Sequence, residues 1–256
     1  MTGAVRDPHG SGAGLPTPLE VVMAMHQIVN HEDWIETRKR FLAKEKEFTR
    51  LRDELSRERR ELPWERIEKD YVFEGEHGNE TLADLFGKHS QLIVYHFMYA
   101  PDWEIGCKSC SFWADNFNGI TPHLNQRDVS MVAISRGPLH KLQEQARKFG
   151  WTFKWVSSAG TDFNFDYGVS FPPPSAEHET APYNYGSMMV KGPEMPGVSA
   201  FIKQGDDIFH TYSTYGRGVD MFNTAYHYLD IAPKGRDEDD LPYPMAWLKH
   251  RIAYES

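Results

Sequence analysis

The two cysteines of the chain, Cys107 and Cys110, are separated by only two residues. An apolar run over residues 91–98 comes shortly before them, and we expect it to form a buried strand. The C-x-x-C then opens a predicted helix. A cysteine pair at the start of a helix that follows a buried strand is typical of a redox site, so the spacing predicts a dithiol/disulfide cycle.

We expect Cys107 to be the nucleophile of that cycle. The amide groups and dipole at a helix N-terminus favour a thiolate in the first turn, and the positive charge of Lys108 should favour it further. Cys110 lies one turn later and would resolve a mixed disulfide formed at Cys107. Such a cycle needs no bound cofactor, only an external reductant, and its partner is a protein or small-molecule thiol or disulfide.

Composition and charge exclude several other classes. The chain has 256 residues and a net charge of −9, which argues against sequence-independent nucleic-acid binding. No apolar run approaches the roughly 20 residues of a membrane span. Residues 1–18 are rich in glycine and proline and have no apolar signal-peptide segment. Because both cysteines lie in one motif, a reducing compartment is indicated. We therefore expect a cytoplasmic protein with neither nucleic-acid nor membrane partners.

Three regions are predicted along the chain. Residues 1–16 are expected to be disordered, residues 17–62 to form a helical extension, and residues 63–256 to form the main domain. In the extension, Thr17 is a helix cap and an apolar helical face continues to Val29. A second helix is predicted from Asp33 to Glu61, with an apolar residue at every seventh position. That seam predicts packing within the chain, with a homodimer as the alternative.

The main domain alternates strands and helices. Strands are predicted at residues 69–73, 92–98, 129–135, 151–156, 198–202 and 208–213. Helices are predicted to begin at Thr81, to run from the cysteine motif to about Asn118 with a break near Gly119 and Pro122, and to cover residues 139–149 and 218–229. Residues 159–181 are expected to be a functional lid or an insertion. This order predicts an α/β protein of thioredoxin-like fold, in its peroxiredoxin-like variant, with an N-terminal helical extension.

Several long motifs carry a resemblance to a known family. They are Phe48–Leu55, Glu68–Glu74, Leu92–Met98, Cys107–Asn116 and Phe209–Ser213. Together they resemble the thioredoxin-like family known as domain of unknown function 899, over most of the chain from Ile35 onward. The resemblance implies a thioredoxin-like fold and little about function. The family's turn often reads C-P-S-C, whereas this chain has Lys108, a departure that bears on redox tuning.

Four further residues are candidates for tuning the thiols or binding a substrate. Trp103 flanks the motif and could shield the thiols. Thioredoxins place a cis-proline opposite their cysteines, just before a central strand, and Pro196 stands in about that place; the alternative is an ordinary loop proline. Tyr212 and Arg217 belong to an aromatic stretch that could form a groove and bind an anion. Peroxiredoxins have a threonine or serine three residues before the reactive cysteine. Here that position is Glu104, which argues against efficient peroxide reduction.

Two other functions use the same residues. A metal carrier of the copper-delivery type would combine Cys107 and Cys110 with His210 or His96, since thiolates and imidazole suit soft copper ions. In those proteins three residues separate the cysteines, and here only two do. A structural zinc site wants four ligands, and the chain has no second cysteine pair. The third hypothesis is a binding scaffold without catalysis.

Overall fold

The computed structural model describes residues 26–173 and 179–254. Contacts within the chain divide it into two units, Met1–Glu58 and Arg59–Ser256. The expected disorder over residues 1–16 and the helix start at Thr17 lie outside the described residues. Ile28 and Val29 are described, and they are exposed and not helical, so the predicted helical face does not extend to Val29.

The long charged helix is present as α2 (His31–Arg60). It begins where the Asn30 side chain accepts a hydrogen bond from the Asp33 amide, at 2.9 Å, and it carries two acidic residues in its first turn. None of its residues is buried, and the heptad residues Trp34, Phe41 and Phe48 are exposed. In the described part of the chain, no helix is long and apolar enough to cross a membrane.

The second unit is built on one mixed sheet, which over the described residues has the order β1-β10-β9-β4-β5-β6-β2-β3. Its strands are β1 (Glu65–Arg66), β2 (Val72–Gly75), β3 (Gly78–Thr81), β4 (Gln91–His96), β5 (Val129–Ser135), β6 (Lys154–Ser157), β9 (Gly197–Gln204) and β10 (Asp207–Tyr215). The strands β4, β5 and β6 are parallel, and β9 is antiparallel to both β4 and β10. A separate ribbon pairs β7 (Ala181–Tyr183) with β8 (Met188–Val190).

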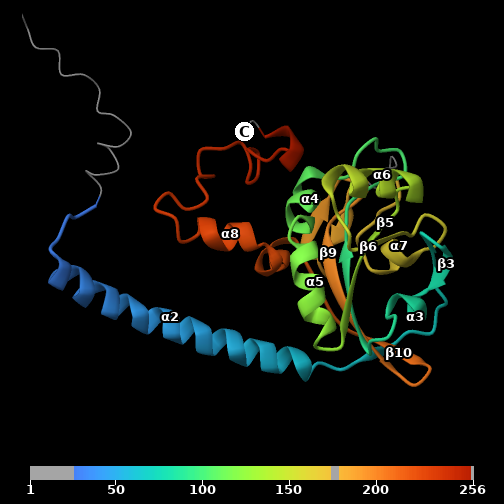
Figure 1. The fold of residues 1–256 in the computed structure, drawn as a ribbon, viewed down its shortest axis with the longest axis horizontal. Coiled ribbons are helices and arrows are strands. Elements are labelled where there is room, and N and C mark those ends of the chain that lie inside the picture. Colours follow the sequence, from blue (N-terminus) through green and yellow to red (C-terminus); the bar gives the residue numbers. More distant parts are fainter. Residues whose placement is uncertain (1–25, 174–178, 255–256) are drawn as a thin grey trace, which may run out of the picture. The chain divides into compact units, whose positions relative to one another are not determined.

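Helices cover both faces of the sheet (Figure 1). On one face lie α4 (Lys108–Ala114), α5 (Phe117–Asn125) and α6 (Leu139–Phe149), and on the other lie α3 (Leu82–Leu85) and α7 (Phe163–Asp166). The chain continues after β10 into a 3-10 helix (Gly216–Phe222), α8 (Thr224–Leu229) and a second 3-10 turn (Arg251–Ala253). The core order β5-β4-β9-β10, with α4 after β4 and a closing hairpin, is the thioredoxin-like fold, and the added β2, β3 and α3 fit its peroxiredoxin variant.

Alternation along β4 explains why both faces carry a core. Leu92 and Val94 pack with α3 and α7, whereas Ile93 and Tyr95 pack with α4, α5 and α6. A strand that is apolar on both sides therefore lies in the middle of the sheet, as its continuous apolar run predicts. We call the side of α4 the cysteine face and the side of α7 the histidine face.

Three local predictions are corrected by the structure. The helix after the cysteines breaks at Asp115 and Asn116, and α5 then runs through Gly119 and Pro122. The predicted helix 218–229 is divided at Asn223, whose side chain caps α8. The expected lid is in part a packed layer, because α7 places Phe163 and Tyr167 in the core of the histidine face.

Candidate active site

Cys107 and Cys110 are held by the backbone that follows β4. Cys107 is the residue immediately before α4, and Cys110 lies within the first turn of that helix. The Cys107 amide donates to the Met98 carbonyl at 3.0 Å, and the Met98 amide donates to the Cys110 sulfur at 3.4 Å. Both cysteines are free thiols; Cys110 is buried and Cys107 is partly exposed. The backbone of Met98, two residues after β4, thus fixes both cysteines.

The loop before the motif is held tightly at Gly106. Its amide donates to the buried Gln145 side chain at 2.7 Å, and its carbonyl lies 3.0 Å from the His250 imidazole. A side chain has no room there, because an added Cβ would lie 2.6 Å from Phe97 and 2.9 Å from Tyr99. Gln145 also donates to Ser111 at 3.3 Å, so α6 braces both the loop and the start of α4.

The surroundings of Cys107 favour its thiolate. Its pKa falls from 9.0 to about 6, and the hydrogen bond from the Cys110 thiol is the largest cause. Partial burial opposes the shift, and the backbone amides of Cys110 and Ser109 support it. These amides do not meet the geometry of a formal capping hydrogen bond, but they face the sulfur at the start of the helix. At neutral pH, Cys107 is therefore an anion.

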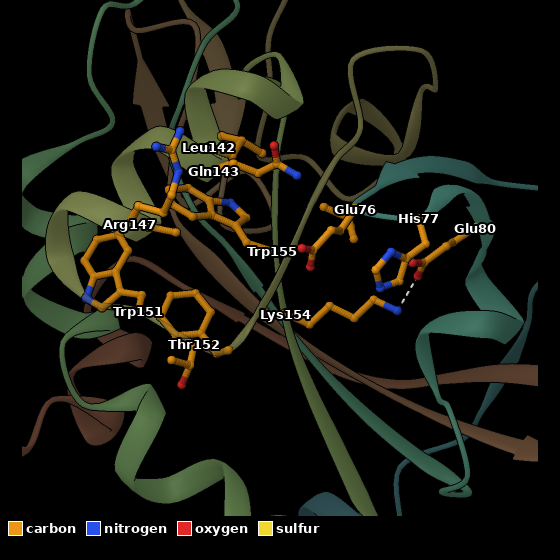
Figure 2. Close-up of a pocket in the computed structure, with 13 residues that line it drawn as sticks. Glu76, His77, Glu80, Leu142, Gln143, Arg147, Trp151, Thr152, Lys154 and Trp155 are labelled. Atoms are coloured by element: carbon orange, nitrogen blue, oxygen red, sulfur yellow. Dashed lines mark ion pairs between the residues drawn. The ribbon is translucent and has the colours of Figure 1, made fainter.

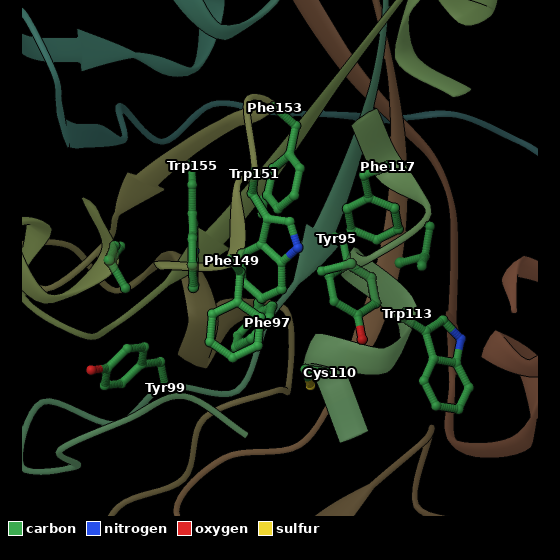
Figure 3. Close-up of a cluster of buried hydrophobic side chains, with 14 of the residues drawn as sticks. Tyr95, Phe97, Tyr99, Cys110, Trp113, Phe117, Phe149, Trp151, Phe153 and Trp155 are labelled. Carbon is green, nitrogen blue, oxygen red and sulfur yellow. The ribbon is translucent and has the colours of Figure 1, made fainter. Parts of the chain in front are cut away.

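Cys110 has the opposite character. Burial raises the pKa of its thiol well above the usual value, and the neighbouring Cys107 raises it further. The hydroxyl of Tyr95, on β4, is hydrogen-bonded to the Cys110 sulfur and opposes that rise. Figure 3 shows the Tyr95 hydroxyl directed at Cys110 from within the aromatic cluster. Burial also raises the pKa of Tyr95, so the contact joins two neutral groups.

The predicted tuning residues have different places. Trp103 and Cys107 both pack against the cluster that contains Cys110, and the Trp103 carbonyl accepts from Lys141 at 2.8 Å. Lys108 is the first residue of α4, but it is not among the main causes of the lowered pKa of Cys107. The side chain of Glu104 is 93% exposed and lies 3.6 Å from Lys141. Trp103 thus packs on the same cluster as the cysteines, while the main causes of the low pKa of Cys107 lie in Cys110 and Ser109.

The cis-proline hypothesis is wrong, because the described chain has no cis peptide bond and Pro196 is trans. The segment before it pairs with the end of the α7 loop: the Met195 amide donates to the Val169 carbonyl at 2.8 Å. A trans bond keeps this segment extended as it enters β9. Pro196 still precedes the strand predicted for it, and its carbonyl accepts from Tyr183.

Tyr212 and Arg217 do not form a groove beside the cysteines. Tyr212 pairs with Ala200, which in turn pairs with Ile93. It is therefore level with the middle of β4, and not with the end of β4 that leads to the cysteines. Its ring lies 4.7 Å below the Arg59 guanidinium. The Arg217 side chain is 83% exposed and pairs with Asp220 at 3.0 Å.

The metal-carrier alternative is corrected by the position of the histidines. His96 follows Tyr95 on β4 and therefore faces the opposite side of the sheet, where it stacks on Phe163. His210 packs on Tyr167 on that same histidine face. Among residues 26–173 and 179–254, no group of three or more histidine, cysteine or acidic side chains could hold a metal ion.

A pocket of about 550 Å³ lies towards the β2–β3 edge of the sheet, between α6, β6 and the β2–β3 turn (Figure 2). It is lined by Trp151, Trp155, Arg147 and the ion pair of Lys154 with Glu80. Neither cysteine borders it. The chemistry of the thiols is therefore not the chemistry of this pocket.

Sequence reasoning missed two residues of the site. In the sequence, Tyr95 is one residue of an apolar strand and Gln145 is one residue of an amphipathic helix. A signal for Tyr95 is nevertheless present, because a tyrosine buried in a central strand needs a partner for its hydroxyl. Alternate residues of a strand point to the same face, and Tyr95 lies with Ile93 on the cysteine face of β4. No comparable signal marks Gln145.

Together, the fold and the paired thiols define a thioredoxin-like protein with a C-x-x-C dithiol. The chain belongs to the family described as bacterial protein of unknown function, domain of unknown function 899, whose model matches residues 23–254. No curated protein matches the sequence.

Solved structures of peroxiredoxins are similar to the chain. Peroxidoxin BcpB from Mycobacterium tuberculosis is 15% identical with a TM-score of 0.46, over 63% of this chain and 90% of that one. Peroxiredoxin Q from Xanthomonas campestris is 16% identical with a TM-score of 0.41, over 64% and 91%. AhpC from Enterococcus faecalis is 12% identical with a TM-score of 0.41, over 60% and 81%.

Proposed function

We propose that this protein is a thiol–disulfide oxidoreductase in which Cys107 is the nucleophile and Cys110 the resolving thiol. The observation that carries the proposal is the unequal placement of the two thiols, with Cys107 partly exposed immediately before α4 and Cys110 buried in its first turn. Cys107 is an anion near neutral pH, while the buried Cys110 remains a thiol that donates a hydrogen bond to it. Such a dithiol has one thiolate that can attack a disulfide and one thiol that can later resolve the mixed disulfide.

The cycle balances with a disulfide as the oxidant. The Cys107 thiolate attacks one sulfur of the substrate disulfide, forms a mixed disulfide and releases the other half as a thiolate. Cys110 then loses its proton to the leaving thiolate and attacks the Cys107 sulfur. The substrate leaves as one thiol and one thiolate, which takes a proton from water, and the protein holds a Cys107–Cys110 disulfide. Two electrons from an external dithiol restore the starting state.

The second step has a specific physical requirement. The thiol of Cys110 must become an anion, although burial opposes its ionisation. The Tyr95 hydroxyl and the Met98 amide both direct hydrogens at this sulfur and stabilise its negative charge. In the second step they stabilise the negative charge on the Cys110 sulfur, as the donors at the helix N-terminus stabilise the charge on Cys107 in the first step.

The substrate class follows from the access to Cys107. Cys107 is partly exposed while Cys110 is buried, so a partner has access to the first cysteine and not to the second. This supports a protein or small-molecule disulfide as the substrate, without a bound cofactor.

The test is the rate of alkylation by iodoacetamide between pH 4 and pH 9, on the metal-free reduced protein. We expect labelling to be confined to Cys107 and to rise through an inflection near pH 6, about 2.5 pH units below that of a free cysteine. A Cys107→Ser variant is the control and should label slowly at every pH. Equilibration with glutathione should also yield an intramolecular disulfide. An inflection above pH 8 together with no such disulfide would leave only the non-catalytic scaffold.

A further inference from the structure

A continuous chain of hydrogen bonds crosses the histidine face of the sheet. The His96 Nε2 atom lies 2.8 Å from the Ser199 hydroxyl, which lies 2.7 Å from the Ser213 hydroxyl. The His210 Nε2 atom lies 2.7 Å from the Ser213 hydroxyl, and its Nδ1 atom lies 3.2 Å from the Glu65 carboxylate. The chain thus runs from a fully buried imidazole to an exposed carboxylate.

The two ends fix the direction of the hydrogens on the two imidazoles. Glu65 is an exposed carboxylate that accepts, so His210 donates to it from Nδ1. At the other end, burial lowers the pKa of His96 to about 3, so this imidazole is neutral and has one N–H. The His96 Nδ1 atom has no hydrogen-bond partner among the residues that the structure describes, so the hydrogen belongs on Nε2, which donates to Ser199.

The middle of the chain then follows. Ser199 accepts from His96 and donates to Ser213. The Ser213 hydroxyl then donates to the free lone pair on Nε2 of His210, in competition with the Tyr215 hydroxyl, which is also hydrogen-bonded to Ser213. A serine hydroxyl that donates to an imidazole, which in turn donates to a carboxylate, is the arrangement of a nucleophilic hydrolase site. Ser213, His210 and Glu65 form such an arrangement here, with Ser199 behind the nucleophile.

A β-bulge is what brings the serine and the histidine together. The register of β10 shifts between His210 and Tyr212, so that His210 pairs with Phe201 and Ser213 pairs with Ser199. Phe201 and Ser199 are two residues apart on β9 and share a face. In a regular strand, residues three apart point to opposite faces, so the bulge is required for the contact.

The three residues line one pocket of about 490 Å³ at the open edge of β10, beyond the end of β1. Leu62, Pro63 and the ring of Tyr185 add apolar surface to its walls. The Tyr185 hydroxyl donates to the Ser213 carbonyl at 3.1 Å. Since the N–H and C=O of one strand residue point the same way, the Ser213 amide also faces this edge and can donate to an oxyanion formed there.

We propose that this pocket is a second catalytic site, in which Ser213 is acylated by a small ester with His210 as the general base. The Ser213 oxygen attacks the ester carbonyl carbon and its proton passes to Nε2 of His210. The C–O bond to the alcohol breaks as His210 returns the proton to the leaving alcohol. Water, deprotonated by His210, then cleaves the acyl-serine to give a carboxylic acid and free Ser213. Glu65 positions the imidazole throughout.

The test uses the full chain with Cys107→Ser and Cys110→Ser, so that no thiolate reacts with the reagents. A fluorophosphonate probe is expected to add one equivalent, which peptide mass spectrometry should locate at Ser213. Hydrolysis of p-nitrophenyl acetate should be faster than the buffer rate and should fall to that rate in Ser213→Ala. The matched control is Ser130→Ala, which removes a partly buried strand hydroxyl on β5, outside this pocket, and should keep the labelling.

Glu65→Gln provides a second readout that does not depend on a buried substitution. Its side chain is 75% exposed, so the fold should survive, while the amide no longer fixes the tautomer of His210. We expect at least a tenfold slower labelling by the fluorophosphonate. Labelling that is equal in the parent and in Ser213→Ala, or that is unaffected by Glu65→Gln, overturns the proposal. Neither result changes the thiol chemistry, which is measured in the wild-type chain.

Discussion

Buried polar side chains on the two faces of β4 have different hydrogen-bond partners. Tyr95 and His96 are consecutive and equally buried, yet the tyrosine meets a thiol and the histidine meets a serine. On the cysteine face, the hydrogen bonds converge on sulfur atoms at the start of a helix. On the histidine face, they form a line that ends at the exposed Glu65.

The difference shows what burial alone does to a titratable group. Desolvation raises the pKa of Cys110 and lowers that of His96, so both are kept neutral. Cys107 is the exception, because a thiol and two backbone amides direct hydrogens at its sulfur. The charge of Cys107 near neutral pH thus depends on the hydrogen-bond donors gathered at the start of α4 on the cysteine face.

The largest effect that would test this comparison is expected from replacing Cys110. The Cys110→Ala variant loses the resolving thiol, so disulfide turnover should fall at least about a thousandfold. It also loses the main hydrogen bond to Cys107, and the pKa of that thiol should rise from about 6 by roughly one to two pH units. The measurements are turnover of a disulfide substrate and iodoacetamide labelling against pH.

Cys110→Ser separates the two roles. The hydroxyl cannot resolve a mixed disulfide, but it can still donate to the Cys107 sulfur, so turnover should be lost while the pKa stays closer to 6. Asp166→Asn, on the histidine face, is the control and should change neither quantity. Equal labelling profiles for the alanine and serine variants would contradict the assigned cause of the low pKa.

The two faces should also lose stability in different pH ranges. His96 has a folded pKa of about 3 against 6.5 when unfolded, so its contribution is present above pH 6.5 and is lost as the pH falls towards 3. The full loss should be about 5 kcal/mol, because a shift of about 3.5 pH units corresponds to about 1.4 kcal/mol for each unit. Cys107, lowered from 9.0 to about 6, contributes above pH 9 and loses that contribution as the pH falls to 6.

Urea unfolding of the reduced and oxidised forms between pH 3 and pH 9 separates these contributions. The free energy of unfolding of the reduced form minus that of the oxidised form should vary with pH only between 6 and 9. The reason is that the oxidised form has no Cys107 thiolate. The slope between pH 3 and 6 should be the same in both forms and should flatten in His96→Gln. A slope in the acidic range that depends on the redox state would contradict the separation of the two faces.

Much of the fold could be predicted from the sequence because its signals are local. The continuous apolar runs of β4 and β5 indicated central strands, and the C-x-x-C indicated the start of a helix; both are confirmed. Gly150 closes α6 in the left-handed region, as a glycine after an amphipathic helix predicts. Each of these depends on residues within one element or its immediate neighbours.

The rest depends on contacts between distant elements. Gln145 reaches Gly106 from 39 residues away, and Ser213 meets Ser199 across a hairpin that contains a bulge. A pattern along one strand does not locate a bulge, so it could not show that His210 shares a face with Ser213. The metal-carrier hypothesis placed His96 and His210 near the cysteines for the same reason, because residue types alone do not give the face to which each imidazole points.

The loop that presents the cysteines is expected to tolerate no side chain at Gly106. In Gly106→Ala, the new Cβ would meet Phe97 at 2.6 Å, so we expect a destabilisation of about 2 kcal/mol and a slower disulfide cycle. The control is Gly119→Ala in α5, where nothing lies within 4 Å of the added carbon and helix propensity favours alanine by about 0.5–1 kcal/mol. Thermal unfolding measures both. Equal changes in the two variants would show that the loop is not tightly held.

The smallest effect is expected at Tyr95, and it tests the comparison most directly. Tyr95→Phe keeps the ring in the cluster but removes the hydrogen bond to Cys110, so the pKa of that buried thiol should rise further. A lost hydrogen bond of about 1 kcal/mol corresponds to resolution that is roughly fivefold slower, whereas the first attack by Cys107 should keep its rate. Stopped-flow kinetics with a chromogenic disulfide separate the two steps. Tyr71→Phe, which removes a hydroxyl bonded to Asp166 on the histidine face, should leave both rates unchanged. If Tyr95→Phe slowed the attack and not the resolution, the hydroxyl would act on Cys107, and the division of roles between the two cysteines would have to be reversed.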